Sequence, residues 1–332
     1  MSKKMWIIMI AAICVVVCAA VVLCVCLLKK GKEPDPEVPQ GGDPVVDEPM
    51  PEIGAEAKLS YTLNPDGASY TVSGVESKLV YTVTVPDTYE NLPVTAIADA
   101  LFEDASSVST LTIGKNVASI GDKAFYNCDG LTSVVLPDSL RTLGMQAFSC
   151  CDSITALTLG NGVTSIGYAA FSGCAALSKI TIPASVTFVA EDAFAGCSML
   201  DAVHITDLAA WCAIDFQYAS ANPLSVAGNL YVNDALVTAL TLPDSVSAIG
   251  KYAFYNANAI KSVTIPADLR SIGAQAFASC DALTDATFAE SAEWWVYETA
   301  SADTGNAISL PSTFAAAECL KDTYAAYYWK RG

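Results

Sequence analysis

The twelve cysteines are the residues whose spacing could build a metal site or a disulfide framework. Five of them recur at one position of a 23-residue period, but no two of the five show the short paired spacing of zinc sites. Equivalent positions in stacked coils lie about 4.8 Å apart, within disulfide range, although parallel side chains rarely reach the required torsion. We therefore expect a ladder of buried, reduced thiols, with disulfides or a metal as the alternatives. The five are Cys128, Cys151, Cys174, Cys197 and Cys280.

Catalytic chemistry has few candidates in this chain. His204 is its single histidine, and it lies between two aliphatic residues of a predicted strand, so alternation directs it away from the core. No GxSxG, HExxH or phosphate-loop motif accompanies it. The carboxylate pairs Glu191 with Asp192 and Glu293 with Glu298 could hydrolyse a glycan only if each pair flanked a cleft. We expect no enzymatic activity, no metal and no cofactor, and a surface glycan-acting enzyme is the least favoured function.

A regular spacing of phenylalanines indicates the element that positions these residues. Seven phenylalanines follow one another at intervals of 23 residues, with a single interval of 60. An aliphatic residue lies five positions before each ring and is usually followed by glycine, and further apolar columns lie six, nine and eleven positions after the ring. Self-similarity at a fixed short period is typical of solenoids. The seven are Phe102, Phe125, Phe148, Phe171, Phe194, Phe254 and Phe277.

Each period is expected to contain one short strand. The segment LTSVVLP at residues 131–137 alternates like a half-buried strand, and its proline ends the strand where no donor is required. The glycine column indicates a tight turn, and we expect the Ala-Phe pair that follows it to form a short helical turn. One 23-residue unit cannot bury its own apolar face, so the units must stack and pair their strands in parallel.

The repeats resemble a known family. The phrase VTSIGYAAFSGCAALSKITIPASV at residues 163–186 is similar to the BspA-like leucine-rich repeats of bacterial cell-surface proteins, and the match runs from about residue 94 to residue 290. Ala257 departs from it by replacing the usual cysteine, and Ala286 and Phe288 depart in the last strand. The resemblance implies a leucine-rich repeat solenoid, secreted or attached to the cell surface, that binds host, matrix or neighbouring-cell molecules.

The N-terminal region differs in composition from the repeats. After a short tail at residues 1–4, residues 5–28 carry no charge and would form a helix about 36 Å long, enough to cross a bilayer core of about 30 Å. We expect an uncleaved transmembrane signal anchor, with cleavage and secretion as the alternative. Residues 29–56 are rich in proline and acidic residues and are predicted to form a disordered stalk. The protein is therefore expected in the cell membrane as a single-pass protein, with its repeats extracellular, although flanking lysines leave the orientation nearly tied.

The remaining boundaries follow from the repeat columns. Residues 57–92 are predicted to form an N-terminal cap with a β-hairpin around residues 65–67, and residues 93–290 the solenoid. An aberrant insertion at residues 206–240 is expected to bulge from one rim and to carry a hairpin at Asn233 and Asp234. The aromatic residues of 291–332 are predicted to cover the last core layer, with a sugar-stacking platform as the alternative.

One outward column of the strands, ten positions after each phenylalanine, is mostly threonine. Threonine suits a strand for packing reasons alone, but an open polar face could also bind a protein or a glycan. The candidate ligand-binding face is Thr158, Lys179, Thr181, His204 and Thr264. After residue 32 the chain has 12 basic against 35 acidic residues, which disfavours nucleic acid as a partner. We expect an adhesion or binding module for an extracellular ligand, with a structural or self-assembling spacer as the alternative.

Overall fold

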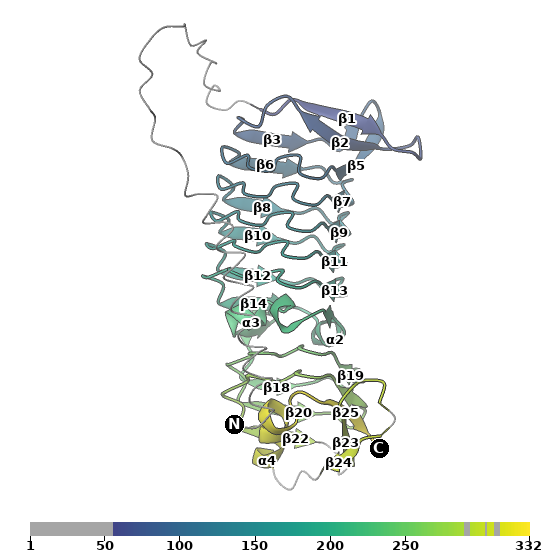
Figure 1. Cartoon of the computed structure of the whole chain (residues 1–332), viewed down its shortest axis with the longest axis vertical. Coiled ribbons are helices and arrows are strands. Elements are labelled where there is room, and N and C mark those ends of the chain that lie inside the picture. The colour runs from purple at the N-terminus through teal and green to yellow at the C-terminus, as the bar shows by residue number, and fades with distance from the viewer. Residues whose placement is uncertain (1–55, 289–292, 303, 309–312) are drawn as a thin grey trace, which may run out of the picture.

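The computed structural model describes residues 56–288, 293–302, 304–308 and 313–332, whose coils stack into an elongated column (Figure 1). The predicted membrane segment 5–28 lies outside the described residues, as does the predicted stalk apart from Glu56. Within the described part of the chain, no helix is long and apolar enough to span a bilayer.

The first side of the column carries the strands predicted from the alternating apolar positions. They pair in parallel within the groups β3–β6, β8–β10 and β12–β14–β16, and after the insertion within β18–β20–β22. These strands are β3 (Thr82–Val85), β6 (Thr110–Ile113), β8 (Ser133–Val135), β10 (Ala156–Thr158), β12 (Lys179–Thr181), β14 (Ala202–Ile205), β16 (Leu230–Val232), β18 (Ala239–Thr241), β20 (Ser262–Ile265) and β22 (Asp285–Phe288).

A second row of strands shows that the expectation of one strand per coil is wrong. The aliphatic residue five positions before each phenylalanine lies in a strand, usually of two residues, that pairs in parallel with the same strand of the next coil. These strands are β5 (Leu92–Ile97), β7 (Ser119–Ile120), β9 (Thr142–Leu143), β11 (Ser165–Ile166), β13 (Phe188–Val189), β19 (Ala248–Ile249) and β21 (Ser271–Ile272). Strand β15 (Asp215–Phe216) of the insertion pairs with β13 and extends the row. Most of these strands are too short to show an alternation of apolar and polar residues in the sequence, because each contributes only one side chain to the core.

The Ala-Phe segment forms a non-helical turn, so the predicted helical turn is also wrong. The Phe125 amide donates to the Ala147 carbonyl of the next coil at 2.8 Å, and other repeats make the same bond. Lys123 and Asn127, two residues before and after the ring, have left-handed φ angles of 55° and 58°. The backbone donors of this turn therefore join neighbouring coils instead of closing a helix.

The glycine column reflects close approach between coils. A Cβ atom added at Gly144 would lie 2.5 Å from the main-chain carbon of Gly121 in the preceding coil. No side-chain adjustment can relieve a contact with backbone, so glycine allows the coils to stack at this distance.

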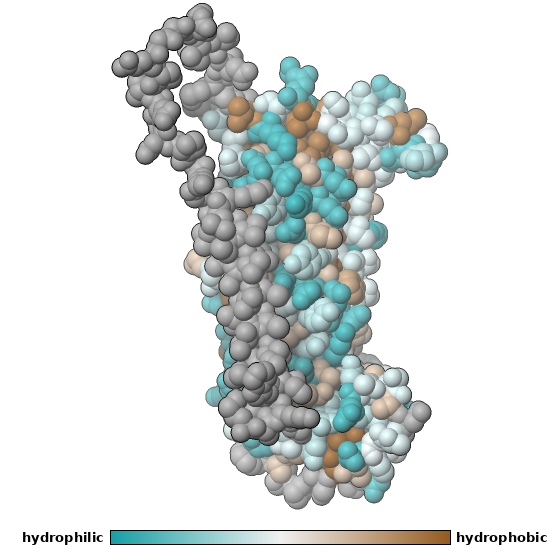
Figure 2. All heavy atoms as spheres, viewed as in Figure 1, coloured by the Kyte–Doolittle hydropathy of each residue, from teal (hydrophilic) through white to brown (hydrophobic). Residues whose placement is uncertain are grey.

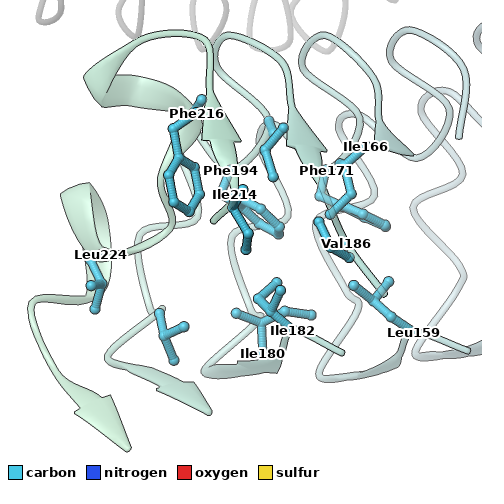
Figure 3. Close-up of a cluster of buried hydrophobic side chains, with 14 of the residues drawn as sticks. Leu159, Ile166, Phe171, Ile180, Ile182, Val186, Phe194, Ile214, Phe216 and Leu224 are labelled. Atoms are coloured by element: carbon cyan, nitrogen blue, oxygen red, sulfur yellow. The ribbon is translucent and has the colours of Figure 1, made fainter. Parts of the chain in front are cut away.

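The core consists of stacked phenylalanine rings opposed by aliphatic side chains from the first row of strands (Figure 3). Neighbouring rings from Phe102 to Phe194 have centroids 5.0 to 5.8 Å apart and lie nearly parallel. A second stack joins Phe254 and Phe277 at 5.1 Å. The rings thus form two stacks within one continuous hydrophobic cluster.

The insertion between the two stacks supplies a core layer, which corrects the expectation that it bulges from a rim. Asp207 caps helix α2 (Leu208–Cys212) by accepting two backbone hydrogen bonds at 2.9 Å. Trp211 is buried, and its indole nitrogen donates to the Ala253 carbonyl at 2.8 Å. Phe216 of β15 and Leu224 of helix α3 (Leu224–Ala227) complete the layer, and a 3-10 turn (Ala219–Ala221) joins them. The insertion is integrated because its aromatic and aliphatic residues replace the missing ring.

Both ends of the stack are covered. At the start, β1 (Leu59–Leu63) and β2 (Tyr70–Val75) form the predicted hairpin, and β4 (Thr88–Tyr89) pairs with β5. At the end, β23 (Trp294–Tyr297), β24 (Asn306–Ile308) and β25 (Tyr328–Arg331) form an antiparallel extension of β21, accompanied by α4 (Thr313–Glu318) and a π-helical turn (Cys319–Thr323). Trp294 and Trp329 are buried beside Phe288 and so cover the last core layer.

Candidate ligand-binding face

Strand alternation positions the predicted face. In β12 the Ile180 side chain is buried, whereas Lys179 and Thr181 on either side of it are exposed. The neighbouring strand β14 is paired so that Thr181 lies opposite His204. Three of the predicted residues, Lys179, Thr181 and His204, are therefore adjacent on one surface.

His204 lies outside the core as predicted, but other side chains partly cover it. Its ring stacks on Tyr231 of β16 with centroids 4.7 Å apart and planes 5° from parallel. Its Nδ1 atom lies 2.9 Å from Oδ1 of Asp234, so the pair shares a hydrogen bond. The histidine side chain is 19% exposed and the aspartate 92% exposed. The ring is thus fixed in one orientation while the carboxylate remains open to a ligand.

A short hairpin presents Tyr231 and Asp234. Strand β16 pairs in parallel with β14, and β17 (Ala235–Leu236) returns antiparallel to β16. The turn residues Asn233 and Asp234 have left-handed φ angles of 49° and 63°, a conformation that asparagine and aspartate tolerate better than most residues. This hairpin is the part of the insertion that extends the candidate face.

The face differs from the predicted set at two places. Thr158 lies in β10, in the coil preceding Lys179, but Thr264 lies in β20, beyond β16, β17 and β18, so it does not join the cluster. Tyr231 was missed because it follows His204 by 27 residues instead of 23, which removes it from the column alignment. The predicted hairpin at Asn233 and Asp234 could have identified Tyr231, because a hairpin turn implies a strand directly before it.

The outer surface is mainly polar, and its exposed apolar side chains are scattered. Figure 2 shows one side of the column, where hydrophilic residues are spread along its length and hydrophobic ones are scattered. Large exposed apolar side chains such as Val135 and Met199 belong to different coils. Dispersed apolar residues are ordinary for a protein surface, so a partner on this side would be recognised mainly through hydrogen bonds and charge.

The cysteines of the ladder lie in the core, where they contribute to packing. Each of the five ladder thiols is buried and free, and each donates to the carbonyl of the phenylalanine one coil earlier, as Cys174 does to Phe148 at 3.3 Å. Burial raises the pKa of the Cys197 and Cys280 thiols to about 12. The described residues contain no group of three or more histidine, cysteine and acidic residues that could hold a metal.

The carboxylate pairs do not flank a cleft in the described structure. Glu191 and Asp192 are consecutive residues of a single turn. Burial, and then the neighbouring Asp192 charge, raises the pKa of Glu191. Glu293 and Glu298 lie at the two ends of β23. Neither arrangement places two carboxyl groups on opposite sides of a bound sugar.

The comparison with family models agrees with this architecture. The family model described as "BspA type Leucine rich repeat region" matches residues 91–213 and 225–314 in six copies. Among solved structures, the chain is similar to a leucine-rich repeat protein of T. pallidum (22% identity, 68% of this chain and 87% of that chain, TM-score 0.45). It is also similar to a leucine-rich cell surface protein of Faecalibacterium prausnitzii (25% identity, 70% and 76%, TM-score 0.41). No curated protein matches the sequence. Because the family model covers more than half of its length, the chain belongs to the BspA-type leucine-rich repeat family.

Proposed function

We propose that this chain is a surface-attached bacterial binding protein whose ligand, a protein or a glycan, contacts the face formed by Lys179, Thr181, His204, Tyr231 and Asp234. The observation that carries the proposal is the fixed His204 ring, stacked on Tyr231 and hydrogen bonded to Asp234 at an otherwise simple solenoid surface. Elsewhere in the solenoid, the outward positions mostly hold small or β-branched residues, for which strand packing is a sufficient explanation.

The cluster supplies complementary groups for a polar ligand. Lys179 provides a cationic donor, Thr181 a hydroxyl group, and Asp234 an exposed anionic acceptor. The stacked His204 and Tyr231 rings need little further ordering on binding, so less conformational entropy is lost when a ligand is captured. Hydroxyl-rich glycans and polar protein surfaces match this set of donors and acceptors.

Attachment to the cell surface is part of the proposal. The uncharged segment 5–28 is long enough to anchor the chain, and the proline-rich acidic segment 29–56 would extend the repeats away from the membrane. Membership of the BspA-type family supports the same location.

A matched pair of double variants tests the face. We expect Lys179→Glu with Thr181→Glu to reduce capture of the ligand at least tenfold, because the change removes the Lys179 cation and the Thr181 hydroxyl and adds two carboxylates to the strand that pairs with the His204 strand. The control, Thr110→Glu with Thr112→Glu, changes the equivalent outward positions of β6 and should bind like the parent. The free energy of unfolding of both variants should lie within about 0.5 kcal/mol of that of the parent, since substitutions at exposed positions rarely affect stability.

The assay is binding of the full chain, in mild detergent, to arrays of extracellular matrix proteins and cell-surface glycans. The proposal fails if the β12 double variant keeps every interaction of the parent, or if the β6 control loses them equally. Light scattering that rises with protein concentration, without capture of any array member, would favour the self-assembling spacer.

A further inference from the structure

The longest sheet of the column ends in an open strand. Strand β1 (Leu59–Leu63) is the first of nine strands in this sheet, and it pairs with β2 on one side only, within the described residues. It is the uppermost strand of the column in Figure 1. An unpaired edge strand is a template for further pairing, so proteins usually protect such edges with charged residues, proline or a bulge.

Strand β1 lacks these protections. Its sequence LSYTL contains neither a charged residue nor proline. The hairpin has a bulge, but the extra residue is Ser73 of β2, so β1 itself remains regular. Of the nine large apolar side chains that are exposed in the described residues, three lie in the N-terminal cap, namely Leu63, Leu79 and Tyr89. This end of the solenoid is therefore less polar than a cap that only has to keep the column soluble.

The hydrogen bonds of the hairpin show which backbone groups lie on the open edge. The Lys58 carbonyl and the Asn64 amide, at the two ends of β1, bond to the returning chain of the hairpin. Residues that bond inward and outward alternate along an antiparallel strand. The amides and carbonyls of Leu59, Tyr61 and Leu63 therefore point away from β2, toward a strand that could add to the edge.

The sequence of β1 is complementary to itself when one copy runs in the opposite direction. Antiparallel pairing about Tyr61 would place Leu59 opposite Leu63, and Ser60 opposite Thr62. Apolar side chains would then meet on one face and hydroxyl groups on the other, which are favourable cross-strand pairs. Leu59 and Tyr61 already pack partly against the core, so this apolar face would continue from one column into the next.

We propose that two copies of this chain form a closed dimer by antiparallel pairing of their β1 strands about Tyr61. A twofold contact uses the same edge of both copies, so the assembly ends at two chains. Two five-residue strands make a smaller contact than a standard protein interface, so the dimer is weak in solution. On the surface attachment proposed above, anchoring in one membrane would raise the effective concentration of the two edges.

A pair of double variants tests both the edge and its register. Ser60→Lys with Thr62→Lys places cations opposite cations across the twofold axis, and should weaken dimerisation at least about tenfold. Ser60→Glu with Thr62→Lys instead places a carboxylate opposite each cation, and should dimerise at least as tightly as the parent. Both side chains are exposed, so both variants should have the melting temperature of the parent.

The measurement is light scattering coupled to size-exclusion chromatography of the full chain in mild detergent, with the protein mass separated from the detergent mass. The parent should move from 34.7 kDa toward twice that mass as its concentration rises, and should stop there. A single-chain mass at every concentration, equal dimerisation of the two variants, or growth beyond two chains would overturn the proposal. Lys179→Glu with Thr181→Glu should dimerise like the parent, so loss of the dimer and loss of ligand capture are separate results.

Discussion

The stacked rings make a sharp prediction about how stability is distributed along the column. Phe171 is fully buried, with the rings of Phe148 and Phe194 5.8 and 5.7 Å away on its two sides. Replacing it with alanine leaves a cavity between two coils that hydrogen bonds hold in place, so collapse is restricted. We expect Phe171→Ala to lower the free energy of unfolding by about 3–5 kcal/mol.

A double-mutant cycle separates ring stacking from simple loss of volume. Phe148 and Phe171 are neighbours and should couple by about 0.5–1.5 kcal/mol. Phe125 and Phe171 both stack on Phe148 but not on each other, so their alanine substitutions should add within about 0.5 kcal/mol. Urea unfolding followed by fluorescence of the buried tryptophans provides the measurement. A loss below about 1 kcal/mol for Phe171→Ala, or equal coupling in the two pairs, would refute the stacked-core explanation.

Three further predictions concern the thiols and the cap. Serine at Cys174 should cost about 1–3 kcal/mol by burying a hydroxyl, whereas alanine, which fills this column at Ala257, should cost less in the same urea assay. Burial raises the pKa of Cys197 to about 12, so the stabilisation from its neutral thiol is complete below about pH 8.5 and is lost as pH rises toward 12. The urea concentration at the midpoint of unfolding should therefore decrease as the pH is raised from 7.5 to 10.5. The decrease should be smaller in Cys197→Ala. Trp329→Ala should expose the last coil and lower the melting temperature by several degrees in calorimetry.

The repeat period predicted most of the core. Every phenylalanine of the 23-residue column is buried, and the strand predicted within residues 131–137 appears as β8. The ladder thiols are buried and free, as expected from their parallel directions. These predictions succeeded because a position repeated in every coil must satisfy the same packing constraint each time.

The second row of strands and the insertion could not be predicted in this way. A two-residue strand such as β9 has no period of its own, and it is recognisable only once the neighbouring coil is in place. The Trp211 indole bonds to a carbonyl 42 residues later, and no local pattern encodes that contact. For the same reason, the candidate face could be predicted at Lys179 and Thr181, which obey the period, but not at Tyr231, which does not.

The insertion connects the stability of the column with its candidate binding face. Trp211, Phe216 and Leu224 fill the layer between the two phenylalanine stacks, while Tyr231 and Asp234 of the same insertion extend the outer surface. A polar, irregular segment can be kept in a solenoid only if it also seals the core that it interrupts. Its apolar half therefore holds the two stacks together, while its hairpin lies on the outer surface and contacts His204. That division explains why the candidate polar face lies where the insertion departs from the repeat.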